Sequence, residues 1–317
     1  MTRVAAIDCG TNSIRLLVAD VGSAPSADSA GGGTLTEVVR AMEIVRLGEG
    51  VDRTGRLSRA AIDRTRIALA GYARTIASTG AERVRMVATS ASRDASNAED
   101  FRAMVRGVLG QDAEVITGDA EARLSFAGAV GGLRAEAPYL VVDIGGGSTE
   151  FVLGTTTVEA ARSVDIGCVR LTERHLHDDP PTAAQIAAAE ADIRAAVESV
   201  RSVVSVERAR TLVGLAGSVT TVTALALGLP AYDSVKIHHA RITAAQVAEV
   251  TSMLLRSTHA ERAAFGVLHP GRVDVIGAGA LVLRVLMEAV GADEVIASEH
   301  DILDGIALSL DPVSRRS

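Results

Sequence analysis

The chain has 317 residues, 48% of them hydrophobic and 22% charged, and a formal net charge of −7. This length and composition are typical of a globular protein with enough apolar side chains for two cores. The acidic balance and an aromatic content of 2% argue against nucleic-acid binding. Two distant cysteines, Cys9 and Cys168, argue against a disulfide framework or a zinc site.

The first motif is a glycine turn between two apolar strands near the N-terminus. Residues 4–7 form a short apolar run that ends in Asp8, and a second apolar run begins at residue 14. The turn between them consists of four small residues, Gly10, Thr11, Asn12 and Ser13. Because Asp8 stops the apolar run, no signal peptide is expected, and we predict a cytoplasmic protein.

The next hundred residues predict strands and helices in alternation. Ser58 is placed to cap a helix, and Ser96 with Glu99 predicts a capping box at the start of another. The expected segments are a polar loop at 22–34, strands at 37–46, 84–88 and 114–117, and helices starting at about 58, 96 and 118.

The second motif is a turn of three glycines between two further strands. Apolar runs at 140–142 and 151–153 flank Gly145, Gly146, Gly147 and Ser148. Glycines let the backbone approach a ligand closely, and successive amides in such a turn bind anions. Asp143 and Glu150 flank the turn, and two carboxylates beside a phosphate require a bridging Mg²⁺. The alternative is a flexible hairpin with acids at the surface.

The two motifs repeat each other. Asp8, Gly10 and Ser13 align with Asp143, Gly145 and Ser148 at a constant offset of 135 residues. Such a repeat predicts two similar domains that face each other across a cleft. A nucleotide-binding loop of the Gly-Lys-Ser type is excluded, since the single lysine, Lys236, follows a valine.

The remaining chain also alternates between strands and helices. Residues 211–232 carry no charge, but their glycines, proline and threonines favour strand, turn and helix over a membrane span. Gly217 and Ser218 form the turn and are candidates to bind further phosphates or a nucleoside. The expected segments are strands at 158–165, 212–215 and 294–297, and helices at 182–204, 243–257, 272–290 and 301–310.

Four segments together resemble the exopolyphosphatase/guanosine pentaphosphate phosphatase (Ppx/GppA) family of the actin-like ATPase and sugar-kinase superfamily. They begin, in chain order, at Asp8, Gly118, Asp143 and Gly214. The resemblance covers about residues 3–310. It implies an α/β protein with two actin-like (ribonuclease H-like) domains and an active-site cleft between them. We expect one domain at 1–120 plus about 300–317, and the other at 121–299.

The resemblance also implies roles for individual residues. From the sequence alone, Glu121 is best explained as an acid favoured by the helix dipole. The resemblance reverses this interpretation, because Glu121 matches the family's catalytic carboxylate and would take a proton from the attacking water. Many relatives have two successive acids here, whereas this chain has Ala120 before Glu121. Asp143 is the first choice for a ligand of Mg²⁺, or of Mn²⁺ as the alternative metal. Glu150 and Asp8 would assist in binding the metal. Glu150 is also a candidate catalytic residue.

Several other side chains have two interpretations. Arg93 would bind a phosphate, or else pair with its neighbour Asp94 or lie on a solvated surface. Arg170 and Arg272 are weaker candidates for a polyanion site, and solvated positions are favoured for both. The pair His238-His239 has no partner at metal-ligand spacing, which favours a surface turn.

The expected activity is hydrolysis of the terminal phosphate of inorganic polyphosphate. Long relatives carry a further C-terminal domain that extends the polymer-binding surface, whereas this chain stops near residue 317. We therefore expect a preference for short polyphosphates. The alternative substrate is guanosine pentaphosphate, with guanosine tetraphosphate as a possible ligand. A kinase of the same fold or a nucleotide sensor without turnover are the competing classes. We expect a homodimer and no nucleic-acid or membrane partner.

Overall fold

The computed structural model describes residues 1–22 and 34–311 and divides the chain into two compact units. Unit 1 comprises Met1–Gly132 with Asp301–Ser317, and unit 2 comprises Leu133–His300. The polar loop expected at 22–34 lies almost wholly outside the described ranges. The boundary expected at residues 120–121 falls within a helix that belongs entirely to unit 1.

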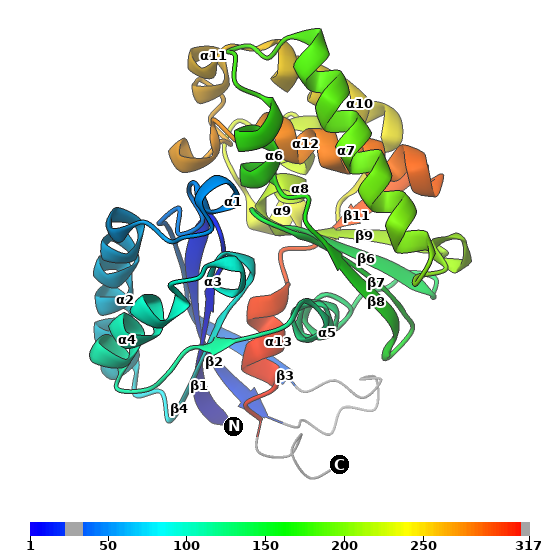
Figure 1. Cartoon of the computed structure of the whole chain (residues 1–317). Helices are drawn as coiled ribbons and strands as arrows, with labels where there is room; N and C mark the ends of the chain where they lie inside the picture. Colours follow the sequence, from blue (N-terminus) through cyan, green and yellow to red (C-terminus); the bar gives the residue numbers. More distant parts are fainter. Residues whose placement is uncertain (23–33, 312–317) are drawn as a thin grey trace. The chain divides into compact units, whose positions relative to one another are not determined.

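Unit 1 is a five-stranded sheet with helices on both faces (Figure 1). The strand order is β3-β2-β1-β4-β5, in which β1 pairs antiparallel with β2 and parallel with β4. The strands are β1 (Thr2–Cys9), β2 (Ser13–Gly22), β3 (Thr34–Ile44), β4 (Arg83–Ala88) and β5 (Glu114–Val115). The helices are α1 (Val51–Thr54), α2 (Arg59–Thr79), α3 (Ser90–Asp94), α4 (Ala98–Leu109), α5 (Gly118–Ala129) and α13 (Ile302–Leu308).

Side chains of β1 alternate between the two faces of this sheet, as expected for a strand buried on both sides. Ala5 and Ile7 join the core under α2 and α4, whereas Val4 and Ala6 join the core under α13. Asp8 continues the second set, so it lies on the face that α13 covers.

Unit 2 repeats the same sheet order and adds one edge strand. Its order is β10-β11-β9-β6-β7-β8, and β6 pairs antiparallel with β7 and parallel with β9. The strands are β6 (Tyr139–Ile144), β7 (Thr149–Gly154), β8 (Val158–Val164), β9 (Thr211–Leu215), β10 (Arg241–Thr243) and β11 (Glu294–Ala297). The helices are α6 (Cys168–His175), α7 (Ala183–Arg201), α8 (Ala216–Ala226), α9 (Ser234–Ile237), α10 (Ala244–Arg256), α11 (His259–Ala263) and α12 (Ile276–Val290), with 3₁₀ turns at Val206–Arg208 and Pro270–Arg272.

The core of unit 2 lies between one face of its sheet and the helices α7, α8, α10 and α12. Leu140, Val142 and Ile144 of β6 point into it. Asp143 alternates with these residues, so it lies on the opposite face of the sheet. The duplicated sheet order confirms the predicted fold class, because three antiparallel strands followed by parallel ones, in the same order in both units, are the ribonuclease H-like plan of actin-like proteins.

Local signals located most helix starts. The Ser58 side chain accepts a hydrogen bond from the Ala61 amide at 3.1 Å, as predicted for a cap. The capping box at Ser96 and Glu99 is wrong, because α4 begins at Ala98 and the Ser96 hydroxyl donates to the Gly55 carbonyl instead. The Ser96 side chain therefore makes a tertiary hydrogen bond instead of the helix cap that the local pattern predicted.

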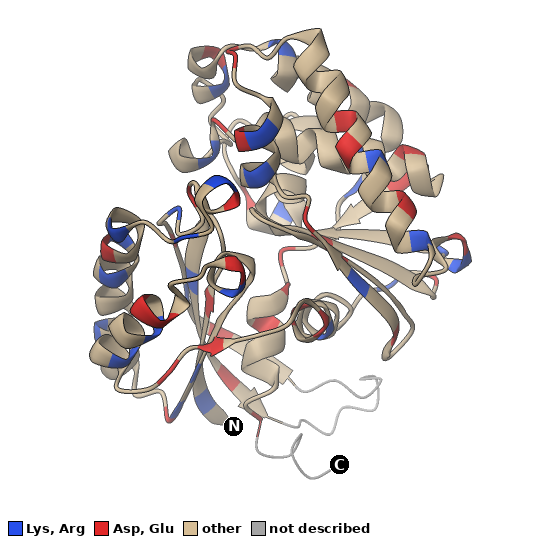
Figure 2. Ribbon diagram, in the orientation of Figure 1, with Lys and Arg blue, Asp and Glu red and all other residues tan. Residues whose placement is uncertain are grey.

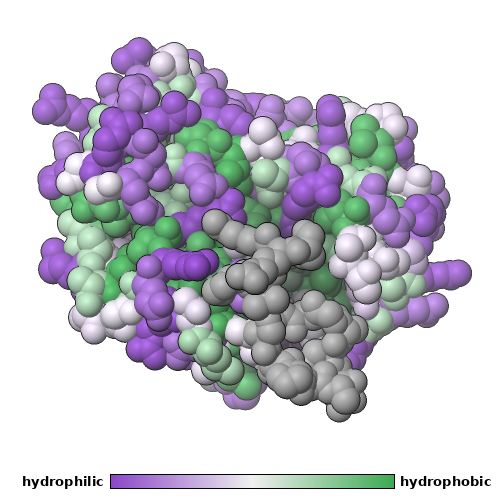
Figure 3. All heavy atoms as spheres, turned by 90° about the horizontal axis from the view of Figure 1, so that it is seen from below, coloured by the Kyte–Doolittle hydropathy of each residue, from purple (hydrophilic) through white to green (hydrophobic). Residues whose placement is uncertain are grey.

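The surface is mixed in charge. Figure 2 shows acidic and basic residues interspersed along α2 and α4, in keeping with the ion pairs Arg66–Asp63 and Arg102–Glu99. On the face shown in Figure 3, hydrophilic residues dominate and hydrophobic residues appear in separate patches. Within the described ranges, no helix combines the length and the apolar character that crossing a bilayer requires.

Candidate active site

Turn 1, residues 10–13 between β1 and β2, is closed by the Gly10 amide, which donates to the Ser13 carbonyl at 3.0 Å. The Asn12 carbonyl accepts from the amides of Val45 and Arg46 at 3.1 and 2.8 Å. The Thr11 carbonyl accepts from the Gly48 amide at 2.9 Å. The loop that follows β3 therefore fixes the carbonyl side of turn 1.

Turn 2, residues 145–148 between β6 and β7, has the same closing bond. The Gly145 amide donates to the Ser148 carbonyl at 3.0 Å. Among the described residues, no acceptor lies within hydrogen-bond distance of the amides of Gly146, Gly147 and Ser148. Such a row of adjacent N–H groups is suited to phosphate oxygens.

The carbonyls of turn 2 are held from behind by the start of α6. The Gly145 carbonyl accepts from the Cys168 amide at 3.0 Å, and the Gly146 carbonyl accepts from the Val169 amide at 2.9 Å. Gly167 is required at this contact, because a Cβ there would lie 2.4 Å from the Gly146 carbonyl carbon. With its carbonyls bonded on one side, the turn presents its amides on the other.

Arg170 completes this support. Its Nε donates to the Gly147 carbonyl at 2.7 Å, and its side chain is only 12% exposed. The solvated position favoured from the sequence is therefore wrong for Arg170, which orders the glycine turn.

Asp143 and Glu150 are direct cross-strand partners in the β6–β7 ladder, and both are buried. Directly opposite residues of an antiparallel pair share one face, where two like charges destabilise each other. Ser163 on β8 donates to Oε1 of Glu150 at 2.7 Å. Two buried carboxylates on one face fit a divalent cation.

A metal there would need additional ligands. Within residues 1–22 and 34–311, no three His, Cys, Asp or Glu side chains form a group that could hold a metal ion by themselves. Mg²⁺ commonly takes one or two carboxylates and completes its shell with water and substrate phosphates. The carboxylate pair beside turn 2 fits this donor set.

Asp8 has a different neighbour. Its cross-strand partner is Arg15, whose Nε and Nη2 donate to Oδ2 of Asp8 at 3.1 and 2.6 Å. Burial raises the pKa of Asp8, and the Arg15 charge opposes this shift. Oδ1 of Asp8 is buried and has no hydrogen-bond partner among the described residues, so only this oxygen remains for the predicted assisting role at a metal.

Glu121 lies in the first turn of α5, which Thr117 caps by accepting from the Ala120 amide at 3.2 Å. Nη1 of Arg93 lies 3.3 Å from Oε2 of Glu121 and donates to the Ile116 carbonyl at 3.0 Å. The sequence did not predict this partner, whereas the predicted pairing of Arg93 with Asp94 is present at 4.0 Å. Arg93 orients Glu121, whose side chain is 10% exposed.

Gly217 and Ser218 lie in the first turn of α8, directly after β9. A Cβ at Gly217 would lie 1.4 Å from Nη1 of Arg272, so the guanidinium rests on this glycine. Burial raises the pKa of the Cys168 thiol, against the Arg272 charge and a hydrogen bond with Ser218. Arg272 is therefore part of this corner of unit 2, where the sequence favoured a solvated arginine.

Gly217 is preceded by Ala216, which has a φ of 65°. A left-handed non-glycine residue at a strand-to-helix junction is strained, and such strain is common at functional turns.

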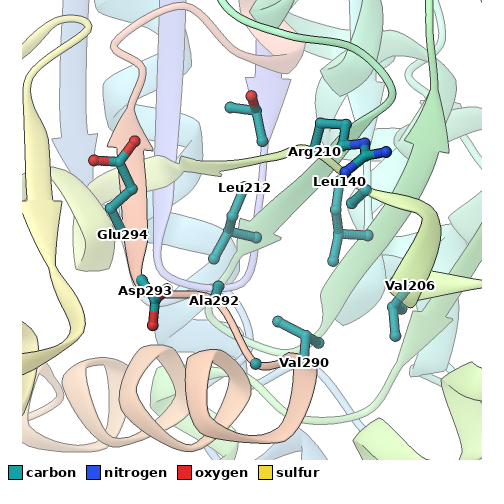
Figure 4. A pocket seen from close by; sticks show the side chains of 11 residues that line it. Leu140, Val206, Arg210, Leu212, Val290, Ala292, Asp293 and Glu294 are labelled. Carbon is teal, nitrogen blue, oxygen red and sulfur yellow. The ribbon is translucent and has the colours of Figure 1, made fainter.

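A separate pocket of about 270 Å³ lies at the other end of the unit 2 sheet. Figure 4 shows Leu140, Leu212 and Val290 lining it together with Arg210 and Glu294, at the amino ends of β6, β9 and β11. Ligands of α/β folds bind at the carboxyl ends of the parallel strands. This pocket therefore does not belong to the site built on turn 2.

The candidate residues thus form one group in each unit. Unit 1 contains turn 1, Asp8, Arg93 and Glu121, and unit 2 contains turn 2, Asp143, Glu150, Gly217 and Ser218. His238 and His239 lie in a turn after α9, as predicted, and are half-buried; their rings stack at 3.8 Å, and the ring of His300 lies 4.4 Å from that of His238.

A duplicated ribonuclease H-like sheet with an aspartate and a small-residue turn in each copy defines a class, the actin-like phosphotransferases and hydrolases. A profile of the Ppx/GppA phosphatase family matches residues 27–312. The chain belongs to the Ppx/GppA phosphatase family.

Relatives agree with this assignment. Exopolyphosphatase 2 of Mycobacterium tuberculosis is 55% identical over 320 residues, which cover 98% of this chain and 99% of the relative. A guanosine-5′-triphosphate,3′-diphosphate pyrophosphatase of Aeromonas salmonicida is 28% identical, over 96% of this chain and 59% of its own length.

Solved structures show the same fold. An exopolyphosphatase-like protein superposes with a TM-score of 0.92 at 43% identity and covers 99% of both chains. The Ppx/GppA protein of Aquifex aeolicus gives a TM-score of 0.81 at 32% identity, over 100% of this chain and 99% of its own.

Proposed function

We propose that the protein is an exopolyphosphatase that hydrolyses the terminal phosphoanhydride bond of inorganic polyphosphate. The observation that carries the proposal is the amide row of turn 2 beside the facing carboxylates Asp143 and Glu150. This combination suits a phosphate held together with a divalent cation. The 55% identity to a protein named exopolyphosphatase 2 supports the choice of substrate.

Each group has a role in this reaction. The amides of residues 146–148 bind the oxygens of the terminal phosphate, and those of turn 1, with Gly217 and Ser218, bind the following phosphates. Glu121, oriented by Arg93 at 3.3 Å, takes the proton of the attacking water. The products are orthophosphate and a chain one unit shorter.

Asp143 and Glu150 would hold Mg²⁺, or Mn²⁺ in its place, and Oδ1 of Asp8 would assist. When bound, the ion neutralises negative charge on the phosphate oxygens and on the departing chain. Glu150 is kept in place for this role by the 2.7 Å hydrogen bond from Ser163.

Phosphate release tests the proposal. Wild-type protein with Mg²⁺ should release orthophosphate from polyphosphate of defined length, and Glu121→Gln should lower kcat by about 10²–10⁴-fold, the usual contribution of a general base. The matched control is Asp119→Asn, since Asp119 lies in the same helical turn but is 60% exposed and paired with Arg123. Equal activity in Glu121→Gln and wild type would contradict the role of Glu121.

Guanosine pentaphosphate is the second candidate substrate, and the relative from Aeromonas salmonicida favours it. Its 5′-triphosphate offers the same terminal phosphoanhydride. Side-by-side kcat/KM values on polyphosphates of several lengths and on guanosine pentaphosphate decide between the two. We expect the short polyphosphates to give the highest values. Binding without release of phosphate would identify a sensor, and transfer to an acceptor would identify a kinase.

A homodimer and a cytoplasmic location are further parts of the proposal, drawn from the family resemblance. Light scattering of the purified chain tests the first and fractionation of cells tests the second. A monomer at assay concentration would contradict the proposed homodimer.

A further inference from the structure

We propose that Arg15 is a positioning residue for the reaction. It ties turn 1 to the start of α13, and α13 in turn fixes the position of the helix that carries Glu121. The inference rests on the proposed function, because positioning is measured through catalysis. It concerns unit 1 alone.

Arg15 bridges two buried carboxylates. Its Nε and Nη2 donate to Oδ2 of Asp8, and its Nη1 donates to Oδ2 of Asp301. Asp8 is 4% exposed and Asp301 is 3% exposed. A planar guanidinium can bind both carboxylates at once in a fixed geometry, which the single ammonium of a lysine cannot reproduce. Arg15 thereby joins the aspartate before turn 1 to Asp301, which lies 286 positions after Arg15 along the chain.

Asp301 is also the residue on which α13 begins. Its Oδ1 accepts from the Leu303 amide at 3.0 Å, and its own amide donates to Oδ2 of Asp304 at 3.0 Å. Arg40 on β3 holds Asp304 with a 2.7 Å contact from Nη2 to Oδ1. Arginines of the neighbouring strands β2 and β3 thus hold the first turn of α13.

On its other side, α13 meets α5 backbone to backbone. A Cβ at Gly128 would lie 1.9 Å from the Asp301 carbonyl oxygen. A Cβ at Gly305 would lie 2.0 Å from the Leu124 carbonyl oxygen. Since no side chain separates the helices, a shift of α13 moves α5, and Glu121 lies about 10 Å from Gly128 along that helix at 1.5 Å per residue.

The unbroken contacts therefore run from Asp8 through Arg15 and Asp301 to α13, and from α13 to α5 and Glu121. Phosphoryl transfer depends on placing the water relative to the phosphate, and a misplacement of about 1 Å can cost about 10²-fold in rate. A buried ion network that set only stability would lower the melting temperature and leave kcat unchanged. The two roles make different predictions.

Asp301→Asn is the more selective variant. Asparagine can still accept from the Leu303 amide and cap α13, but it loses the ionic contact with Arg15. Arg15→Lys keeps the positive charge but loses the planar guanidinium that binds both carboxylates at once. For both variants we expect kcat for phosphate release from a polyphosphate of defined length to fall about tenfold or more, and Arg15→Gln to lose more than Arg15→Lys. KM should change less than kcat.

The control is Arg3→Lys. Arg3 and Asp20 are also cross-strand partners in the β1–β2 ladder, with contacts of 2.8 and 2.9 Å, but at its opposite end. This variant should keep the wild-type kcat. If Arg15→Lys does not fold, Asp301→Asn alone decides.

Folded Asp301→Asn and Arg15→Lys proteins with lowered melting temperatures and wild-type kcat would overturn the positioning role. That result leaves the proposed function intact, since the wild type would still release phosphate. A wild type inactive on polyphosphate and on guanosine pentaphosphate would instead refute the proposed function.

Discussion

Turn 1 and turn 2 share a backbone and differ in charge. In each unit an aspartate is the penultimate residue of the strand before the turn, and a glycine amide closes the turn onto a serine carbonyl at 3.0 Å. The residue directly across the ladder from Asp8 is Arg15, whereas the residue across from Asp143 is Glu150. Both lie seven positions after their aspartate, so the duplicated position carries opposite charges in the two units.

The cross-strand neighbour determines what each aspartate can do. Arg15 neutralises Asp8 within the protein and links it to Asp301. Burial raises the pKa of Asp301, but the charge of Arg15 and the Leu303 amide outweigh this effect and lower it. Glu150 adds a second carboxylate beside Asp143, and two facing carboxylates fit the divalent cation of the proposed reaction. The duplicated turn is thus flanked by an ion-paired aspartate in unit 1 and by the carboxylate pair that we propose as the metal ligands in unit 2.

The largest loss of activity is expected when the acid across the ladder from Asp143 is replaced by arginine, the residue found across from Asp8. Glu150→Arg should lower phosphate release with Mg²⁺ by about 10³-fold, because the loss of metal binding removes several kcal/mol of charge stabilisation. Steady-state phosphate release measures this loss. The control is Glu198→Arg, at a side chain of α7 that is 80% exposed. An active Glu150→Arg protein would show that the carboxylate pair is not the metal site.

The reverse exchange tests unit 1. Arg15→Glu would bury three carboxylates together, and the free energy of unfolding should fall by about 3–5 kcal/mol, the usual effect of removing one partner of a buried ion network. Urea unfolding measures this change. The same substitution at Arg3, whose side chain is 37% exposed, should cost much less, because solvent screens an exposed ion pair. Similar losses at both positions would remove the distinction between the two ends of the ladder.

The glycines that support the turns should respond differently. Gly167→Ala places a Cβ 2.4 Å from the backbone of Gly146, whereas Gly48→Ala places one 2.3 Å from the Thr11 side chain. Overpacking costs about 1–3 kcal/mol, and we expect the upper part of this range for Gly167→Ala because backbone cannot rotate away. Gly107→Ala, with open space around the new methyl group, serves as the control in thermal unfolding. A larger loss for Gly48→Ala would contradict this order.

The smallest expected effect depends on pH and concerns unit 2. Burial, and to a lesser degree the charge of His300, lower the pKa of His239. The unfolded chain therefore binds a proton at higher pH than the folded protein does, so stability falls as the pH drops through the ordinary histidine range near 6.5.

His239→Asn should reduce this acid sensitivity, and asparagine tolerates the φ of 63° at this position. The melting temperature at pH 7 and pH 5 measures the effect. An unchanged difference between the two values would show that other groups cause it.

Local patterns in the sequence predicted what depends on local chemistry. The Asp8 and Asp143 turns could be found because glycine and small polar residues directly follow apolar strands. The repeat predicted two similar domains, the family resemblance supplied the actin-like fold, and the Ser58 cap followed from its position before an amphipathic helix. The role of Arg170 was missed, because its bond to Gly147 spans 23 residues and leaves no local signal.

Long-range contacts account for the other differences. The Arg15–Asp301 link spans 286 residues, and the Arg93–Glu121 contact spans 28 residues. An arginine has the same helix or strand propensity whether it is solvated or buried against a carboxylate, so propensity cannot identify either pair. The start of α4 was mispredicted for the same reason: the Ser96 hydroxyl donates to the distant Gly55 carbonyl, and the helix begins at Ala98.

Metal binding without substrate tests the difference between the two aspartates most directly. Titration of the protein with Mn²⁺, followed by electron paramagnetic resonance, should show at least about tenfold weaker binding for Asp143→Asn, as expected for a lost ligand, and about threefold or less for Asp8→Asn. Wild-type affinity in Asp143→Asn, together with a strong loss in Asp8→Asn, would contradict the account.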